Sequence, residues 1–139
     1  MKLAITLLTI ATAFTAAFGA DDVIAKTLYA EARGEGRRGL EYVASVIYNR
    51  GKGDAEKCVK ACLKRKQFSC WNGKSDIKVN RNSKAWRICV ELQEQIERGT
   101  FKPLTKAKHY YANTIKTPKW AQGKQSVLIG NHYFVYDVK

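Results

Sequence analysis

Acidic side chains are scarce in this sequence, so those that could take part in chemistry can be compared one by one. The 139 residues contain 12 Asp and Glu against 25 Lys and Arg. Most of the acidic residues fall near a chain end, at a predicted helix cap or on the polar side of a predicted helix. Glu31 and Glu35 do not. General acid–base chemistry by a carboxyl group is therefore the first reaction type to consider.

Glu31 lies on the apolar side of a helix predicted over about residues 22–32, because Ile24 and Leu28 precede it at helical spacing. It also lies near the carboxyl end of that helix. Burial and the negative end of the helix dipole both disfavour an ionised side chain there. A carboxyl group that keeps its proton near neutral pH can protonate a leaving oxygen. On spacing alone, a structural glutamate held by a neighbouring arginine explains the same pattern.

Other chemistries fit the residue types less well. Cys58, Cys62, His109 and His132 could ligate zinc, but cysteines of an exported chain more often pair as disulfides, so neither a metal nor a cofactor is expected. The two histidines could also act as the acid and base of a secreted ribonuclease. A Ser–His–Asp triad has no nucleophile elbow to support it. Four cysteines that can pair with one another make a cysteine nucleophile an unattractive hypothesis.

Residues 1–19 combine a short basic start with an apolar, threonine-rich run. This pattern is typical of a secretory signal peptide, and an uncleaved or temporary membrane anchor is the alternative. Either interpretation places residues 20–139 in the periplasm, in the cell wall or outside the cell. We expect these residues to form one catalytic domain.

The formal net charge of +13 predicts an acidic partner. Residues 98–136 contain no carboxylate at all. Export disfavours nucleic acid, so anionic cell-wall polymers are the expected partner. A basic surface that only keeps the protein soluble is the plain alternative, and a non-catalytic wall-binding or antimicrobial protein is another.

The elements that must position Glu31 follow from periodicity and capping residues. Helical patterns dominate the first two-thirds of the chain, and short alternating, aromatic segments follow. We therefore predict an α+β fold, mainly helical, with a small C-terminal β-ribbon. The predicted helices cover about 22–32, 39–50, 54–64 and 82–98, and the predicted strands cover 109–112 and 130–138, with loops over 67–80 and 117–125.

Residues 27–50 contain Glu-Ala-Arg-Gly-Glu, a further glycine, an apolar helical stretch and a closing Asn-Arg. This block resembles the opening motif of cell-wall hydrolases typified by the spore cortex-lytic enzyme SleB. Residues 67–72 resemble the glutamine-phenylalanine-serine segment of that family. Segments 109–113, 118–120 and 129–134 resemble its aromatic and histidine segments, in the same order.

The resemblance implies a lysozyme-like domain that cuts peptidoglycan between N-acetylmuramic acid and N-acetylglucosamine. It implies that Glu31 is the catalytic acid and that Glu35 holds the loop or binds substrate. Ordinary glycosidases use two carboxylates, but the sequence places no second one obviously across the cleft from Glu31. A lytic transglycosylase forming 1,6-anhydro ends is therefore expected, and a hydrolytic muramidase assisted by Glu35 is the alternative. A bacterial housekeeping enzyme and a phage endolysin fit equally well.

The polar and aromatic motif residues suit a sugar-binding groove, in which rings stack on pyranose faces and amides bind acetamido groups. The expected partner is the peptidoglycan glycan strand, bound by a monomer. The residues predicted to bind substrate are Glu35, Asn49, Gln67, Trp71, Tyr110, Tyr111, Asn113, Trp120 and His132.

Four cysteines in an exported chain predict two disulfides. Cys58 and Cys62 lie about one helical turn apart, and a bond between them would distort that turn. We therefore predict the pairs Cys62–Cys70 and Cys58–Cys89, with the crossed pairing as the alternative.

Overall fold

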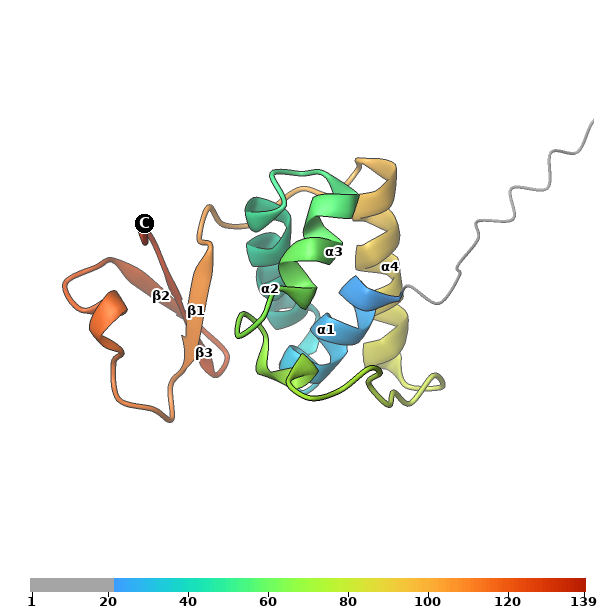
Figure 1. The fold of residues 1–139 in the computed structure, drawn as a ribbon, viewed down its shortest axis with the longest axis horizontal. Coiled ribbons are helices and arrows are strands. Elements are labelled where there is room, and N and C mark those ends of the chain that lie inside the picture. Colours follow the sequence, from blue (N-terminus) through green and yellow to red (C-terminus); the bar gives the residue numbers. More distant parts are fainter. Residues whose placement is uncertain (1–21) are drawn as a thin grey trace, which may run out of the picture.

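The computed structural model describes residues 22–139, which form four α-helices followed by a small antiparallel sheet (Figure 1). The predicted α+β fold, with its helices first, is confirmed. The predicted signal segment, residues 1–19, lies outside the described residues. Among the residues that are described, no helix is long and apolar enough to cross a membrane.

The four helices begin and end within a few residues of their predicted bounds. Asp54 caps α3, its side chain accepting from the Lys57 backbone N–H at 2.9 Å. Ser83 caps α4 in the same way, accepting from Trp86 at 3.1 Å, and Gly99 ends that helix with a left-handed φ of 71°. The helices are α1 (Val23–Ala32), α2 (Gly36–Arg50), α3 (Ala55–Leu63) and α4 (Lys84–Arg98).

Helix α1 packs against the other three helices, so it lies at the centre of the helical part. Its Ile24 and Leu28 are buried, together with Val43 and Ile47 of α2 and Leu92 of α4. Burying each such side chain stabilises a fold by about 1.5–3 kcal/mol. This packing fixes the direction of α1 and therefore the place where Glu31 lies.

The sheet has three strands where the sequence predicted a ribbon. Its strands are β1 (His109–Ala112), β2 (Ser126–Ile129) and β3 (His132–Val135), in the order β1-β3-β2. The predicted strand 130–138 was wrong at both ends, because Gly130, with a φ of 58°, belongs to the turn that joins β2 to β3, and β3 ends at Val135. Strand β2 was not predicted, because the alternation of exposed and partly buried side chains extends over only four residues.

The register of the sheet assigns its aromatic residues to two faces. Tyr110 is paired with Phe134, and the Phe134 ring lies 5.1 Å from the Tyr42 ring of α2. This face, which we call the inner face, therefore lies against the helices. Tyr111 is paired with Tyr133 on the opposite, outer face, where their rings stack at 5.3 Å.

The predicted disulfides are absent from the structure, in which Cys58, Cys62, Cys70 and Cys89 are free thiols. Cys58 packs against Gly51, which has no room for a side chain beside the sulfur, whereas the Cys62 thiol bonds to Thr27. The predicted pairs Cys62–Cys70 and Cys58–Cys89 are therefore replaced by separate buried contacts. Burial raises the pKa of Cys58 to about 11 and those of the other three thiols to about 12.

Candidate active site

Glu31 lies in the last turn of α1 and is held there by a residue from the sheet. The Tyr110 hydroxyl donates a hydrogen bond to Oε2 of Glu31 at 2.8 Å. The glutamate is half-buried and lines a hollow of about 280 Å³ at the turn between α1 and α2. The packing of β1 against the helices thus joins two residues that lie 79 positions apart.

Tyr110 is a rigid donor for this carboxylate. Its ring lies 5.1 Å from that of His132 and 5.5 Å from that of Phe134, all on the inner face. Burial raises the pKa of Tyr110 well above its ordinary value, and the Glu31 charge adds to the effect. The hydroxyl therefore keeps its proton and can orient the carboxyl group of Glu31.

Cys70 is a second neighbour of this carboxylate. Its pKa is raised to about 12, first by burial and then by the charge of Glu31 and a hydrogen bond to it. The thiol therefore stays protonated at neutral pH and adds no charge beside the glutamate.

Glu35 lies in the same hollow but is occupied by other contacts. Its Oε2 accepts from the Asn131 backbone N–H at 3.0 Å, and its Oε1 accepts from the Asn131 side-chain amide at 3.1 Å. His132 Nδ1 lies 3.7 Å from the same Oε1. A Cβ at Gly39 or at Gly130 would collide with the Glu35 side chain. Glu35 therefore fastens the turn before α2 to the turn between β2 and β3.

Two other predicted substrate ligands use their polar groups within the fold. The Asn49 amide donates to the backbone carbonyls of Thr105 at 2.8 Å and Ala107 at 2.9 Å. The Trp71 indole N–H donates to the Thr27 hydroxyl at 2.8 Å. Asn49 thus holds the segment that leads into β1, and Trp71 ties the loop after α3 to α1.

The remaining predicted ligands do not gather at one place. Tyr110 and His132 lie on the inner face, near Glu31. Tyr111 and Trp120 meet edge to face at 5.8 Å on the outer face, where Trp120 is 39% exposed. Asn113 is exposed just after β1.

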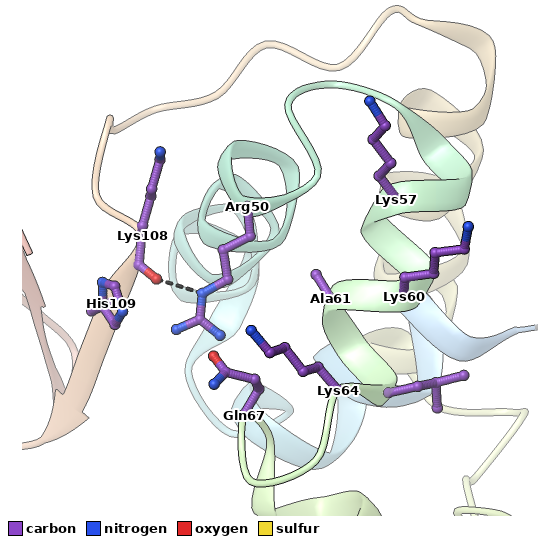
Figure 2. A pocket seen from close by; sticks show the side chains of 9 residues that line it. Arg50, Lys57, Lys60, Ala61, Lys64, Gln67, Lys108 and His109 are labelled. Carbon is purple, nitrogen blue, oxygen red and sulfur yellow. Dashed lines mark hydrogen bonds between the residues drawn. The ribbon is translucent and has the colours of Figure 1, made fainter. Parts of the chain in front are cut away.

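Gln67 lies in a separate cavity of about 650 Å³ between α3, the end of α2 and the start of β1 (Figure 2). We call it the basic cavity, because five of the residues that line it are cationic. These five are Arg50, Lys57, Lys60, Lys64 and Lys108.

The two histidines lie apart in the sheet. His109 lines the basic cavity and is paired with Val135, whereas His132 is paired with Ala112 on the inner face. This placement does not favour a histidine acid–base pair. Within residues 22–139, no group of three or more His, Cys, Asp or Glu side chains is arranged to hold a metal ion.

For several residues of the candidate site and of the basic cavity, the sequence did not reveal the contacts that the structure shows. Tyr110 was expected to stack on sugar, but its hydroxyl holds Glu31. Asn131 was not singled out, although it lies beside the predicted His132. The lysines of the basic cavity do leave a signal, since Lys57, Lys60 and Lys64 recur along one side of α3.

Comparisons with known proteins agree on one kind of domain. The sequence profile described as Cell Wall Hydrolase matches residues 34–135, a segment that begins just after Glu31 and includes Glu35. No match is found among proteins with curated descriptions.

Two solved structures resemble the fold. The catalytic domain of the Bacillus cereus SleB protein has a TM-score of 0.61 at 24% identity, covering 84% of this chain and 91% of that one. The catalytic domain of the germination-specific lytic transglycosylase SleB from Bacillus anthracis has a TM-score of 0.62 at 23% identity, covering 85% and 96%. At these identities the likeness establishes the fold.

Proposed function

This chain belongs to the cell wall hydrolase family, and we propose that it cleaves the bond between N-acetylmuramic acid and N-acetylglucosamine in peptidoglycan, with Glu31 as general acid and base. The observation that carries this proposal is the hydrogen bond from Tyr110 to Glu31. It holds a carboxyl group at the edge of a hollow with a donor that keeps its own proton. A general acid needs such a fixed direction toward its leaving group.

The chemistry requires only one carboxyl group if the substrate supplies the nucleophile. Glu31 gives its proton to the glycosidic oxygen as the bond from that oxygen to C1 of muramic acid breaks. The 6-hydroxyl of the same sugar then bonds to C1 and returns its proton to Glu31. The product is a 1,6-anhydro ring, which makes the enzyme a lytic transglycosylase. The SleB protein of B. anthracis is described by that same activity.

The contacts of Glu35 support this single-carboxylate mechanism. Both of its oxygens accept hydrogen bonds from Asn131, which hold the carboxylate against the turn between β2 and β3. Glu35 nevertheless lines the same hollow as Glu31. That position is the specific reason to keep a hydrolytic muramidase, with Glu35 assisting water, as the second candidate.

Aromatic residues on both faces of the sheet are candidates for sugar contacts. Tyr110 and His132 are close to Glu31, and the partly exposed Trp120 beside Tyr111 offers a ring on which a pyranose can stack. The basic surface would hold the protein on anionic wall polymers, to which residues 1–19 would deliver it by export. In this proposal the protein needs neither a metal nor a second copy.

Mass spectrometry of digested peptidoglycan tests the proposal directly. Purified wall material incubated with the protein should yield fragments that end in 1,6-anhydromuramic acid. Fragments that are heavier by one water throughout would establish hydrolysis and replace the mechanism. Unchanged glycan strands, despite binding to the wall, would favour a non-catalytic wall-binding protein.

A further inference from the structure

The basic cavity has an unusual charge composition that the proposed mechanism does not use. Five cationic residues and no acidic residue line it (Figure 2). One of them, Lys60, pairs with Glu56 at 3.5 Å, but both side chains are more than 70% exposed and water screens that pair. The cavity volume, about 650 Å³, is within the range of small-ligand sites.

Polar atoms at the floor of this cavity lack partners. Within the described part of the chain, two buried side-chain nitrogens without a hydrogen-bond partner are Nη1 of Arg50 and Nδ1 of His109. Both residues line the basic cavity, and Figure 2 shows the Arg50 guanidinium directed between Gln67 and His109. A buried N–H without an acceptor is unfavourable. Nη1 and Nδ1 have almost no accessible surface of their own, but Nη2 of the same guanidinium is not among these buried atoms and can donate to a ligand oxygen in the cavity.

Arg50 is held in place for such a ligand. Its Nε donates to the backbone carbonyl of Lys108 at 2.6 Å, and its guanidinium lies 5.2 Å from the centre of the Phe68 ring. Burial lowers the pKa of Arg50, and the nearby charge of Glu31, which forms no ion pair with it, offsets part of this effect. With Nε bonded and Nη1 buried, Arg50 still offers the N–H groups of Nη2 to a carboxylate or a phosphate.

The wall of the cavity also has an apolar part. Ala61 and Leu63 line it, and Leu63 is 49% exposed. The aliphatic stems of the α3 lysines add to this surface. A ligand that fits must therefore carry both alkyl groups and anionic groups, which describes an acidic peptide better than a chain of sugar or polyol phosphates.

Two side chains, those of Phe68 and Tyr110, lie between the Arg50 end of the cavity and Glu31. Phe68, which lies against Arg50, is 6.5 Å from the Tyr110 ring, and the Tyr110 hydroxyl binds Glu31. A glycan strand cut at Glu31 would carry its peptide from the muramic acid at the cleaved bond. An extended peptide spans about 3.3–3.6 Å per residue, so a peptide of a few residues can reach past two side chains.

We propose that the basic cavity binds the carboxylate groups of the peptide attached to the glycan strand, an inference that rests on the proposed function. Arg50 binds one carboxylate through the N–H groups of Nη2. The lysines of α3 attract the remaining charge, and the Gln67 amide bonds to the peptide backbone.

Calorimetric titration with the free peptide L-Ala-γ-D-Glu-meso-diaminopimelate tests this inference without any cleavage. The wild-type protein should bind it, and the same peptide with its carboxylates converted to amides should not bind. Replacing Lys57, Lys60 and Lys64 together by Gln should weaken binding about tenfold, as expected for three partly screened charges. Amide NMR signals of Ala61 and Gln67 should shift on titration in the wild type.

The matched control removes the same charge elsewhere. Lys84, Lys102 and Lys116 are exposed and do not line the cavity. The control variant with all three replaced by Gln should bind the peptide within about twofold of the wild type, because screening limits the reach of distant charges to about 8–10 Å. Melting curves by circular dichroism establish that both triple variants are folded.

Three results would overturn the inference. One is equal weakening by both triple variants, and another is equal binding of the amidated peptide. The third is binding of polyglycerol phosphate, but not of the peptide, with the same loss in the α3 variant, which would assign the cavity to phosphate polymers. Because binding is measured apart from cleavage, a protein that cuts the wall but ignores the peptide refutes only this inference. A protein that binds the peptide but leaves the glycan intact refutes the proposed function instead.

Discussion

Two regions that meet at β1 present opposite kinds of electrostatic environment. On the inner face, Tyr110 donates to Glu31, and both oxygens of Glu35 accept hydrogen bonds. At the start of the same strand, the basic cavity collects five cations without a carboxylate and leaves nitrogens of Arg50 and His109 unpartnered. A carboxyl group that is already held thus lies a few side chains from a cavity that has no carboxylate among its lining residues.

This difference predicts how each region would act on a substrate. A group held in advance by fixed dipoles lowers a reaction barrier, because no reorganisation is needed when charge develops. Unpaired cations instead gain free energy when an anion arrives, so they contribute to affinity. Substitutions at Glu31 should therefore change the rate, and substitutions in the basic cavity should change binding.

The largest effect is expected from Glu31→Gln, which keeps the shape of the side chain and removes its proton. Cleavage of purified peptidoglycan should fall by about 10²–10⁴, with an unchanged circular dichroism spectrum. Glu35→Gln is the matched control, since it changes the other carboxylate of the same hollow. It should retain more activity than Glu31→Gln while lowering the free energy of unfolding. An inactive Glu35→Gln enzyme beside an active Glu31→Gln enzyme would reverse the assignment.

A smaller loss is expected from Tyr110→Phe, which deletes only the hydroxyl that holds Glu31. A hydrogen bond to a charged group contributes about 1.5–3 kcal/mol, so cleavage should fall by about 10- to 100-fold. The decrease should appear in kcat more than in KM, because the ring and its packing remain. Tyr111→Phe, on the outer face, is the control. Equal losses in the two variants would mean that Tyr110 acts by stacking and does not orient Glu31.

Local sequence signals predicted the helices well, because each signal lies beside the structure that it specifies. Asp54 and Ser83 cap α3 and α4 at the predicted starts of these helices, and the apolar residues of α1 are buried. Strand β2 was missed because its pairing with β3, rather than its own four residues, stabilises it. Glu31 was selected as a candidate from its position on α1.

The rest of the site depends on contacts between distant parts of the chain. Nothing near Glu31 in the sequence identifies Tyr110 as its partner, since β1 must first pack against α1. Asn49 was expected to bind sugar, but its amide holds the segment before β1. The predicted disulfides relied on export and on an even number of cysteines, neither of which places two sulfur atoms together.

The third prediction, on stability, tests whether Glu35 joins the turn before α2 to the turn between β2 and β3. Gly130→Ala adds a Cβ that would collide with Glu35, at a backbone φ of 58°. Gly123→Ala is its control, because that glycine has a φ of 73° but open space around it. The collision should lower the free energy of unfolding by about 1–3 kcal/mol beyond the control. Urea denaturation measures both, and equal costs would show that Glu35 moves aside freely.

The smallest effect is expected at His109, in the basic cavity. Burial lowers the pKa of His109, and the charges of Arg50 and Lys108 lower it further. Above pH of about 6.5, the ordinary value for histidine, the imidazole is neutral in both the folded and the unfolded chain, so it has no effect. Below that pH the unfolded chain binds the proton more readily. Stability should therefore fall as the pH drops from about 6.5 toward the lowered pKa of the folded protein.

A comparison of the wild type with His109→Gln isolates this contribution. Asp76 and Glu91, whose pKa values are lowered by Lys26 and Arg37, also lose stabilising charge in acid, but they do so equally in both proteins. The urea midpoint should therefore fall more steeply between pH 7 and pH 5 in the wild type than in the variant (about the range over which histidine titrates). A bound peptide carboxylate would favour the protonated imidazole, so saturating peptide should reduce the difference. Identical slopes without peptide would show that His109 does not experience the positive charge of the cavity, and the contrast between the Glu31 region and the basic cavity would then rest on Arg50 and the lysines alone.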